Sequence, residues 1–429
     1  MDTLIYVGGA LLFFALIMAS IALHEIGHLV PAKIFGVKTT QYFVGFGKTL
    51  WSTRRGETEY GFKLVPLGGY VKMIGMLPPG RRGMRRSSTG LFTSLIDDAR
   101  SADADDITPA DEGRLFYQKP SWQKLIVMVG GPMMNILLAF LLLLSVNMTF
   151  GMVRETLEIG HVSECMVPAG RTGDTCRPGD PATPAAEAGI RAGDRIVSFN
   201  GVPVQSWDQL SEAIRTNLDD EAVIVVDRGG AEVTLRTHTV LNAVADPTDP
   251  SRTVKAGFLG VSPTMTRVQG GPVETVQQMG TMTERVFAVL VDFPVRVWNV
   301  AADLVTGQER DPNGPMSIVG ASRVAGEMAS TDQIPASEKM AGYISVLGSV
   351  NLFVALFNFI PLLPLDGGHI AGALLEWARR GIARLRRRAD PGPVDIAVLM
   401  PVAYVVAVFV ALCGGVLILA DIIDPVTLF

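Results

Sequence analysis

The chain has 429 residues, of which 48% are hydrophobic and 18% are charged, and its formal net charge is −5 at pH 7. Together with a positive mean hydropathy, this composition excludes a wholly soluble chain and indicates an integral membrane protein with soluble parts. A lipid bilayer is therefore an expected partner, and the charge balance does not favour a nucleic acid.

Four stretches are long enough, or nearly so, to cross a hydrocarbon layer, which takes about 20 helical residues. No Lys or Arg precedes the first stretch. Its apolar run also exceeds the ~7 to 15 residues of a signal-peptide core, so we expect it to be retained. The predicted spans cover Thr3 to Val30, Leu125 to Val153, Tyr343 to Ile360 and Ile396 to Ile423.

Charge sets the expected orientation of these spans. Basic residues outnumber acidic residues between Phe35 and Pro120 and in the short stretch "RRGIARLRRR", whereas acidic residues dominate from Gly151 to Met340. Because loops rich in Lys and Arg stay in the cytoplasm, we predict that both termini and the acidic region face outward.

The first cytoplasmic segment, residues 35–77, alternates aromatic and β-branched residues around glycine-containing turns, which predicts short strands and hairpins. Its stretch "LVPLGGYVKM", Leu64 to Met73, is unusually apolar, so it either dips against the membrane or forms a buried hairpin of a soluble subdomain. Residues 78–118 combine Pro, Gly, Ser and opposed charges without apolar periodicity, which predicts a flexible insertion. We assign no role to this insertion.

The outward region carries "TPAAEAGIRAGDRIVSFNG", Thr183 to Gly201, followed by a helical pattern and a two-strand hairpin pattern, which predict a compact domain. Oxidation is possible here, so Cys165 and Cys176 either form a disulfide or remain two free thiols. After this domain, the spacing of apolar residues from Val273 to Gly307 predicts amphipathic helices near the membrane surface; core helices of the outward domain are the alternative.

The stretch "LHEIGHLV", Leu23 to Val30, places three ionisable groups at the end of the first span. His24 and His28 are four residues apart on a helix, so both rings leave the same face and can share one Zn2+ at about 2.0 to 2.1 Å. Glu25 can reach water in an open coordination position and take its proton. The alternative is a polar helix end at the interface, but ionisable residues inside spans are functional candidates by default.

A third ligand is needed, and the nearest glutamates, Glu57 and Glu59, lie in a polar, turn-rich stretch outside the span. The third span ends in "FNFIPLLPLDGGHI", where Asp366 is the one acid in an apolar run. Broken backbone at membrane depth is tolerated where it lines a cavity or is covered by protein. We therefore predict Asp366 as the third ligand, with His369 as its competitor, although an isolated Asp in this context more often caps a helix or forms a turn.

The pairing of "HEIGH" with a distant "NFIPLLPLDGG" resembles the site-2 protease family of intramembrane zinc metalloproteases. The layout is similar to the regulator-of-sigma-E protease branch, especially its actinobacterial members. "TPAAEAGIRAGDRIVSFNG" resembles the signature of a PDZ domain. Further matches to the branch are "GFG" (Gly45 to Gly47), "LVPLGGYVKM", "GGPMMN" (Gly130 to Asn135) and "NGPMSIVG" (Asn313 to Gly320).

The resemblance implies roles for individual residues. His24, His28 and Asp366 would bind Zn2+, and Glu25 would be the general base. The strand "LVPLGGYVKM" would pair with the substrate by β-addition. The second proline, Pro364, is one place later than in the usual family motif, and Asp366 keeps the usual distance from Asn358. The residues that would position the substrate are Asn358, Leu67, Gly68, Gly69 and Asn135.

The resemblance also implies a fold class: an α-helical polytopic membrane protein with about four transmembrane helices, a membrane-associated cytoplasmic β-hairpin region and an extracytoplasmic α+β PDZ domain, located in a bacterial inner membrane. The expected order is a first span with the histidines (1–34), the β region (35–77), the insertion (78–118), a second span (119–153), the PDZ domain (154–262), an amphipathic helical segment (263–340), a third span with Asp366 (341–375), a basic loop (376–394) and a fourth span (395–429).

The function implied is that of a zinc metalloendopeptidase in regulated intramembrane proteolysis. It would cut the transmembrane segment of a pre-trimmed single-pass protein such as an anti-sigma factor. The PDZ domain would act either as a size filter or as a docking site. One alternative is an inactive PDZ-bearing membrane scaffold, against which the presence of Glu25 argues. A metal transporter is weaker, because transporters tend to show internal repeats of spans and none is seen here.

Overall fold

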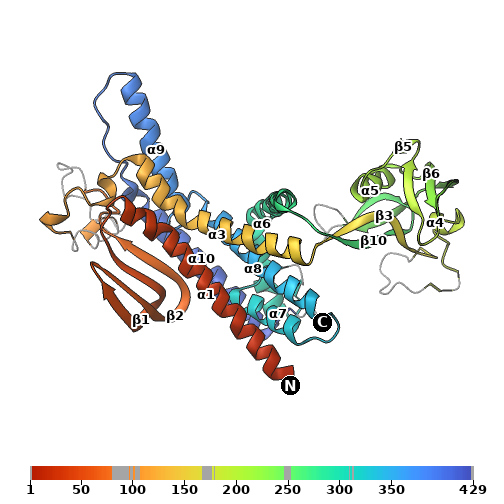
Figure 1. The fold of residues 1–429 in the computed structure, drawn as a ribbon, viewed down its shortest axis with the longest axis horizontal. Helices are drawn as coiled ribbons and strands as arrows, with labels where there is room; N and C mark the ends of the chain where they lie inside the picture. The colour runs from red at the N-terminus through yellow and green to blue at the C-terminus, as the bar shows by residue number, and fades with distance from the viewer. Residues whose placement is uncertain are drawn as a thin grey trace. The chain divides into compact units, whose positions relative to one another are not determined.

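The chain divides into two compact units (Figure 1), one formed by Met1–Phe150 with Gly270–Phe429 and the other by Gly151–Gln269. Each unit is considered by itself below. The structure is a computed structural model, and it describes residues 2–79, 96, 100–101, 107–166, 176–177, 179–245, 253–308, 310–311 and 314–426.

The first unit is mostly helical. Within the described residues, four of its helices are long and apolar enough to cross a membrane. These are Thr3–Ile34, Ser121–Thr149, Ala336–Asn358 and Ile396–Ile423, in agreement with the four predicted spans. The helices are α1 (Asp2–Ile34), α3 (Ser121–Thr149), α6 (Pro272–Thr306), α7 (Ile318–Ser330), α8 (Ala336–Asn358), α9 (Asp366–Leu385) and α10 (Met400–Ile423), with the 3-10 turn η3 (Ile396–Leu399) before α10.

Two helical segments differ from what the sequence led us to expect. The third span ends at Asn358, and a separate helix, α9, begins at Asp366. Pro361 and Pro364 lie in the break, where each removes a backbone donor and cannot continue α8. The segment 376–385, expected as the start of a basic loop, continues α9 instead.

The segment expected as amphipathic helices contains one long helix, α6. Pro272 occupies its first turn, and the Glu274 carboxylate accepts the backbone N–H of Gly271 at 2.7 Å. Gly307, with φ 69°, ends the helix in the left-handed region that glycine adopts without strain. Val297 and Val300 pack against Cys413 and other residues of α10. At least this face of α6 is therefore covered by a membrane-span candidate.

The β region of the first unit lies beside α1 (Figure 1) and consists of two long, bent strands, β1 (Thr39–Arg55) and β2 (Thr58–Met73), where short strands were expected. Val44 of β1 pairs with Phe62 on one side and with Gly69 on the other, so both strands contribute two arms to one antiparallel sheet. The arms lie in the order 49–55, 58–63, 41–44 and 69–73.

This sheet exposes large apolar side chains. Leu64 and Val65 are 58% and 42% exposed, which excludes the buried soluble hairpin as an account of these two positions. Exposed large apolar side chains that gather into a patch mark a contact with a membrane or another protein. Phe46, Leu50, Trp51 and Phe62 are exposed in the same way.

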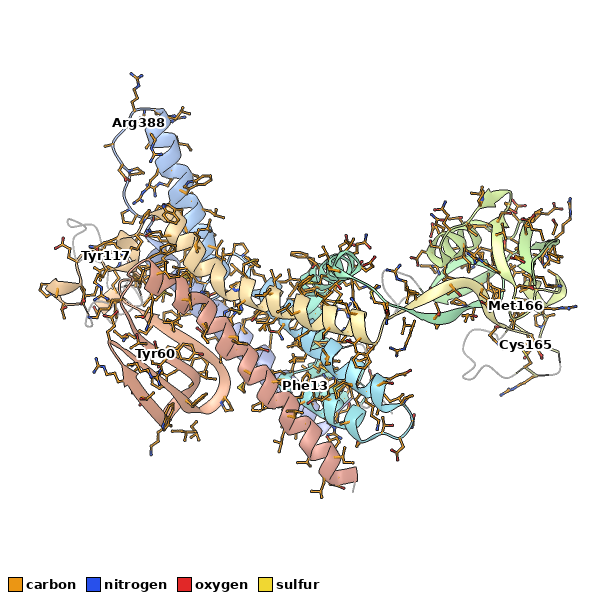
Figure 2. All side chains as sticks on the ribbon, in the orientation of Figure 1. Phe13, Tyr60, Tyr117, Cys165, Met166 and Arg388 are labelled. Carbon is orange, nitrogen blue, oxygen red and sulfur yellow. A yellow bond between two sulfur atoms is a disulfide. The ribbon has the colours of Figure 1, made fainter. Side chains whose placement is uncertain are left out.

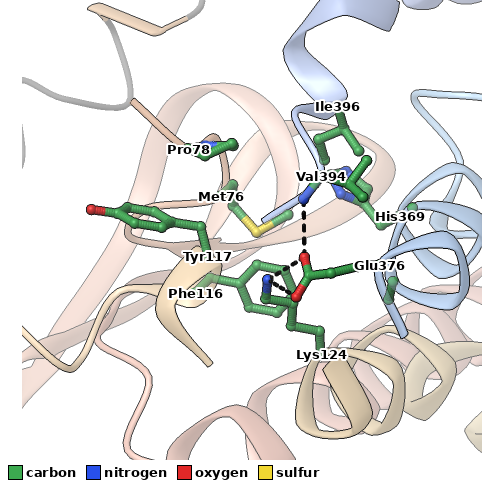
Figure 3. Close-up of a pocket in the computed structure, with 11 residues that line it drawn as sticks. Met76, Pro78, Phe116, Tyr117, Lys124, His369, Glu376, Val394 and Ile396 are labelled. Atoms are coloured by element: carbon green, nitrogen blue, oxygen red, sulfur yellow. Dashed lines mark hydrogen bonds and ion pairs between the residues drawn. The ribbon is translucent and has the colours of Figure 1, made fainter. Parts of the chain in front are cut away.

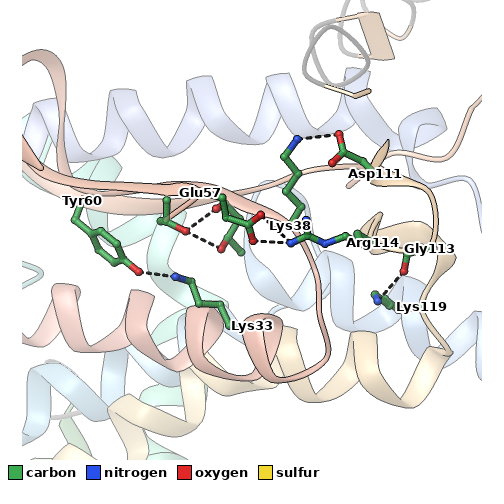
Figure 4. A network of polar contacts seen from close by, with 10 residues as sticks. Lys33, Lys38, Glu57, Tyr60, Asp111, Gly113, Arg114 and Lys119 are labelled. Atoms are coloured by element: carbon green, nitrogen blue, oxygen red, sulfur yellow. Dashed lines mark hydrogen bonds and ion pairs between the residues drawn. The ribbon is translucent and has the colours of Figure 1, made fainter. Parts of the chain in front are cut away.

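Residues 107–118, expected to belong to a flexible insertion, are tied to the β region (Figure 4). Lys38 Nζ bonds to the Asp111 carboxylate at 2.8 Å, and this bond holds the pKa of Asp111 well below its usual range. Arg114 binds both carboxylate oxygens of Glu57, at 2.6 and 2.8 Å. Most of the remaining insertion, residues 80–95, 97–99 and 102–106, lies outside the described residues.

In its described residues, the second unit has an antiparallel sheet and two short helices. Its apolar core includes Ile159, Phe199, Leu210 and Ile224, each of which contributes about 1.5 to 3 kcal/mol on burial. The sheet order is β10 (Val261–Val268), β3 (Met152–Val162), β4 (Arg195–Phe199), β6 (Glu221–Arg228) and β7 (Ala231–His238), with β5 (Val202–Pro203) paired to β4, and β8 (Val240–Ala245) paired to β9 (Thr253–Phe258).

The helices of this unit are α4 (Pro184–Glu187) and α5 (Trp207–Thr216), and α5 begins after Ser206, whose side chain accepts the N–H of Gln209. Cys165 lies before α4 (Figure 2) and is joined to Cys176 by a disulfide in the structure. The two cysteines were expected to be either paired or free, and in the structure they are paired.

Candidate metal centre

Two glycines bring the backbones of α1 and α3 together next to the predicted site. A Cβ atom on Gly27 would lie 2.3 Å from the carbonyl oxygen of Gly130, and a Cβ on Gly130 would lie 2.0 Å from the carbonyl oxygen of Gly27. Either contact is far inside van der Waals distance, so only glycine permits this approach. The crossing fixes α3 against the turn of α1 that carries His24 and His28.

The two histidines project toward each other and toward α3. Their Nε2 atoms are 3.3 Å apart, and both residues are buried. The Nδ1 atom of His28 lies 2.8 Å from the carbonyl oxygen of Val127, a contact in which Nδ1–H donates. Because a neutral imidazole carries one proton, Nε2 of His28 is left with a free lone pair, the form that binds a metal.

Asp366 reaches the histidines from the first turn of α9. Its Oδ2 atom lies 3.2 Å from Nε2 of His24 and 3.3 Å from Nε2 of His28. The two following glycines allow this position, because a Cβ on Gly367 would lie 2.0 Å from the carbonyl oxygen of Ile360. The helix start therefore folds directly onto the segment that follows α8.

The spacing of these three donor atoms fits a zinc ion. Two atoms bound at about 2.0 to 2.1 Å and related by tetrahedral geometry lie about 3.3 Å apart. The three measured separations are 3.2, 3.3 and 3.3 Å. Within the part of the chain that the structure describes, Oδ2 of Asp366 has no hydrogen-bond partner. His24, His28 and Asp366 would therefore be able to hold a zinc ion, with donor atoms spaced as tetrahedral coordination requires.

Glu25 lies between the histidines and the sheet. A Cβ on Gly69 would lie 2.9 Å from Cγ of Glu25, so the strand arm 69–73 passes directly beside this carboxylate. The backbone of Val71 is within hydrogen-bonding reach of the same group. Tyr42, on the neighbouring arm, donates its hydroxyl to the carbonyl oxygen of Ala22 at 2.9 Å, and burial raises the pKa of Tyr42 to about 12. Tyr42 is therefore a neutral donor that ties the sheet to α1.

Four further residues were predicted to position the substrate. Asn135 is buried on α3, one turn after Gly131, and its Oδ1 has no partner among the described residues. Asn358 is the last residue of α8 and is half-buried. Gly68 has φ +121°, and Leu67 precedes it in β2. None of these positions contributes a donor atom to the group of three.

His369, the competitor of Asp366, lies one helical turn further along α9. It lines a cavity of about 20 Å3 together with Lys124 and Glu376 (Figure 3). The donor set that the described residues form next to Glu25 contains Asp366 and not His369.

One residue at the centre was not singled out from the sequence. A Cβ on Gly131 would lie 2.2 Å from Nε2 of His28 and 2.8 Å from Cε1 of His24, so its missing side chain makes room for both rings. The sequence does place it in the stretch "GGPMMN" within an apolar span, where small residues indicate close helix contacts. It does not indicate which helix is approached.

Comparison with known proteins identifies metalloproteases that this chain resembles. The sequence profile of peptidase family M50 matches residues 12–401. The chain is similar to the zinc metalloprotease Rip1 of Mycobacterium tuberculosis, with 32% identity over 440 residues that cover 99% of this chain and 100% of the relative. It is also similar to the zinc metalloprotease Rip1 of Mycolicibacterium smegmatis, with 32% identity over 445 residues that cover 98% of each protein.

Proposed function

The chain belongs to peptidase family M50 and is a zinc metalloprotease. From this premise we propose that the enzyme cuts the membrane-spanning segment of a single-pass protein after another protease has trimmed that protein. An anti-sigma factor is the proposed class of substrate. The observation that carries the proposal is the meeting of His24, His28 and Asp366, three groups from two apolar regions of the chain, beside Glu25.

In the proposed mechanism, His24, His28 and Asp366 hold the zinc ion. When bound, zinc polarises the scissile carbonyl and lowers the pKa of the attacking water toward about 7. The carboxylate of Glu25 accepts a proton from that water and returns it to the nitrogen of the departing amine. Burial of His24, Glu25 and His28 limits other water, and the Asp366 side chain is only 20% exposed. The hydrogen bond from His28 Nδ1 to Val127 keeps one ligand ring in orientation.

The substrate must present an extended strand, because a helical peptide bond is shielded by its own hydrogen-bonded turn. The arm 69–73 of β2 is the proposed template. It forms an edge of the sheet, and no other described strand pairs with its outer side. Since its Gly69 lies against Glu25, a strand added along this edge would bring its backbone to the proposed base. Leu67 and Gly68 would continue this template, and Asn135 and Asn358 would contact the unwound substrate.

The Gly151–Gln269 unit is proposed to be a PDZ domain that faces outward and filters substrates by size. Its insertion between the second and third spans, its β-sheet and its two short helices support this assignment. The Arg-rich stretch at the end of α9 supports an inner-membrane orientation with this stretch in the cytoplasm and both termini outside. The exposed apolar side chains of β1 and β2 support contact between the sheet and the bilayer.

Replacement of the proposed base tests the mechanism. The Glu25→Gln protein should cleave a reconstituted single-span substrate about 10²- to 10⁴-fold more slowly, because the amide cannot accept the proton. Its zinc content should equal that of the wild type, because the three ligands remain. Glu59→Gln, in the sheet and away from the metal centre, is the control and should retain activity. Full activity in Glu25→Gln would disprove the proposed role of this residue.

A further inference from the structure

A buried ion pair links α3 to α9, on the same two helices that contribute to the metal centre (Figure 3). Lys124 Nζ lies 2.8 and 3.0 Å from the two carboxylate oxygens of Glu376. The pair is almost fully enclosed, with side-chain exposures of 6% and 3%. Ser121 also donates to Glu376 at 2.9 Å, and the backbone N–H of Val394 donates at 3.2 Å. Nη1 of Arg380, one turn further along α9, lies 3.2 Å from the same carboxylate.

The cost of burying such charges suggests a role other than stability. Removing two charges from water costs several kcal/mol per ion, and apolar replacements of similar volume are often neutral or stabilising. The best attested use of a buried polar pair is to fix the register of two packed elements. In this protein the two elements are the helix that packs against the histidines and the helix that begins with Asp366.

The position of Lys124 on α3 connects the ion pair to the histidines. Lys124, Val127 and Gly131 follow the i, i+3, i+7 spacing and therefore share one helix face. The carbonyl oxygen of Val127 accepts a hydrogen bond from His28 Nδ1–H, and Gly131 lies against both rings. A single face of α3 thus contacts the two histidines at one point and holds α9 at another.

Three contacts along α9 set the position of its first residue, Asp366. Gly367 packs on the backbone of Ile360, Ile370 packs in one apolar cluster with Val127, and Glu376 bonds to Lys124. Asp366 and Glu376 are separated by about 15 Å of rigid helix. A rotation or slide of α9 at Glu376 is therefore transmitted to the carboxylate of Asp366.

We infer that Lys124 and Glu376 form a positioning clamp that holds Asp366 at ligand distance from His24 and His28. The clamp acts through helix register and does not touch the reacting atoms. The cavity of about 20 Å3 beside it, lined also by His369, has room for about one water molecule. This inference rests on the proposed ligand role of Asp366.

The test measures zinc affinity of the full-length, detergent-purified protein by competition with a chromophoric chelator. In the Lys124→Met/Glu376→Met double variant the zinc dissociation constant should rise about 10- to 100-fold, as for other changes to groups that orient metal ligands. The melting temperature of the metal-free protein should change little, because both buried charges are removed together. Arg380, which also pairs with Glu376 at 3.2 Å, is 27% exposed and keeps Asp390 as a partner at 3.3 Å. A milder variant, Glu376→Asp, keeps the charge but shortens its reach, and its zinc dissociation constant should rise several-fold.

A second buried ion pair in the first unit, between Arg310 and Asp421, provides a matched control. The two side chains are 3% and 2% exposed and bond at 2.6 Å. Arg310→Met/Asp421→Asn removes both charges there, keeps an acceptor for the backbone N–H groups of Ser317 and Gly320, and should leave zinc affinity unchanged.

The outcomes separate the clamp from the proposed metal site. Asp366→Ala should lose zinc binding; if it binds zinc as tightly as the wild type, the proposed ligand set is wrong and the clamp falls with it. If Asp366→Ala loses zinc while the folded double variant and Glu376→Asp both bind it normally, the clamp alone is wrong. If the double variant does not fold, normal zinc affinity in Glu376→Asp is sufficient to overturn the clamp.

Discussion

At the scale of single residues, the centre depends on glycines as much as on its polar groups. Gly27 and Gly130 permit backbone contact between α1 and α3, Gly131 leaves space for the imidazoles, and Gly367 lets α9 begin against the chain that follows α8. Each position would place a Cβ atom under 3 Å from another atom. The polar side chains would supply the proposed chemistry, and the glycines allow those side chains to meet.

Gly131→Ala tests this point. The added methyl group would lie 2.2 Å from Nε2 of His28, so the ring must turn away from the other two donors. We expect the zinc dissociation constant to rise at least about tenfold, comparable to the loss of an orienting contact. Gly414→Ala on α10, where nothing lies within 4 Å of the new Cβ, is the control in a chelator competition experiment. Equal zinc affinity in the two variants would contradict the steric role.

How much of the centre the sequence could predict depends on how local each feature is. His24 and His28 share a helix, so their spacing alone indicates a two-nitrogen site. Asp366 is distant in the chain, but a single acid in an apolar run is distinctive enough to be found. The contact of Gly131 with His28 joins two helices across about a hundred residues, and no pattern within either helix specifies it.

At the scale of elements, the helical spans could be predicted because length and apolarity decide them. The order of the arms in the β1 and β2 sheet could not, because both strands bend and Val44 pairs on both sides. Alternating residues indicate a strand but not which partner it chooses. The start of α9 at Asp366 likewise depends on the fit of Gly367 against Ile360, a contact between segments that a propensity argument does not address.

One ion pair joins two elements of the second unit. Arg228, at the end of β6, binds both carboxylate oxygens of Asp194 at 2.7 Å, and Asp194 also accepts the N–H of Arg191. The hydrogen bonds from Arg228 lower the pKa of Asp194 although burial opposes the shift. Because the folded-state pKa is depressed, the stabilisation is present above the unfolded-state value of about 4. It is lost as the pH falls through the folded-state value.

We therefore expect the excised 151–269 unit to lose stability as the pH falls below about 4. Asp194→Asn should lower the free energy of unfolding at pH 7 by about 2 kcal/mol and should reduce this acid dependence. Urea unfolding at pH 7 and at pH 3 measures both effects. Glu232→Gln, at an exposed position of β7, is the control and should behave as the wild type. An acid dependence as steep in Asp194→Asn as in the wild type would contradict this account.

At the scale of the whole molecule, the second unit is an insertion whose two ends are close together. In the first unit the N–H of Gly270 donates to the carbonyl oxygen of Asn147 at 3.0 Å. Asn147 also bonds through its side chain to Thr275 at the start of α6. In the second unit Met152 pairs with Val268, so its ends are neighbours as well. Each unit has its own core, and neither needs the other to close its chain.

This arrangement permits a direct test of the proposed filter. A variant in which a short Gly-Ser linker replaces residues 151–269 should fold and bind zinc normally, because the linker spans ends that the Asn147–Gly270 bond already holds together. If the unit excludes untrimmed substrates, the variant should cleave a single-span protein with its outer domain intact, which the full-length enzyme should not. The trimmed substrate should be cleaved by both, and the Glu25→Gln form of the variant is the negative control. Loss of cleavage of the trimmed substrate would indicate that the unit docks substrate, since removing a filter cannot slow a reaction that the filter allows.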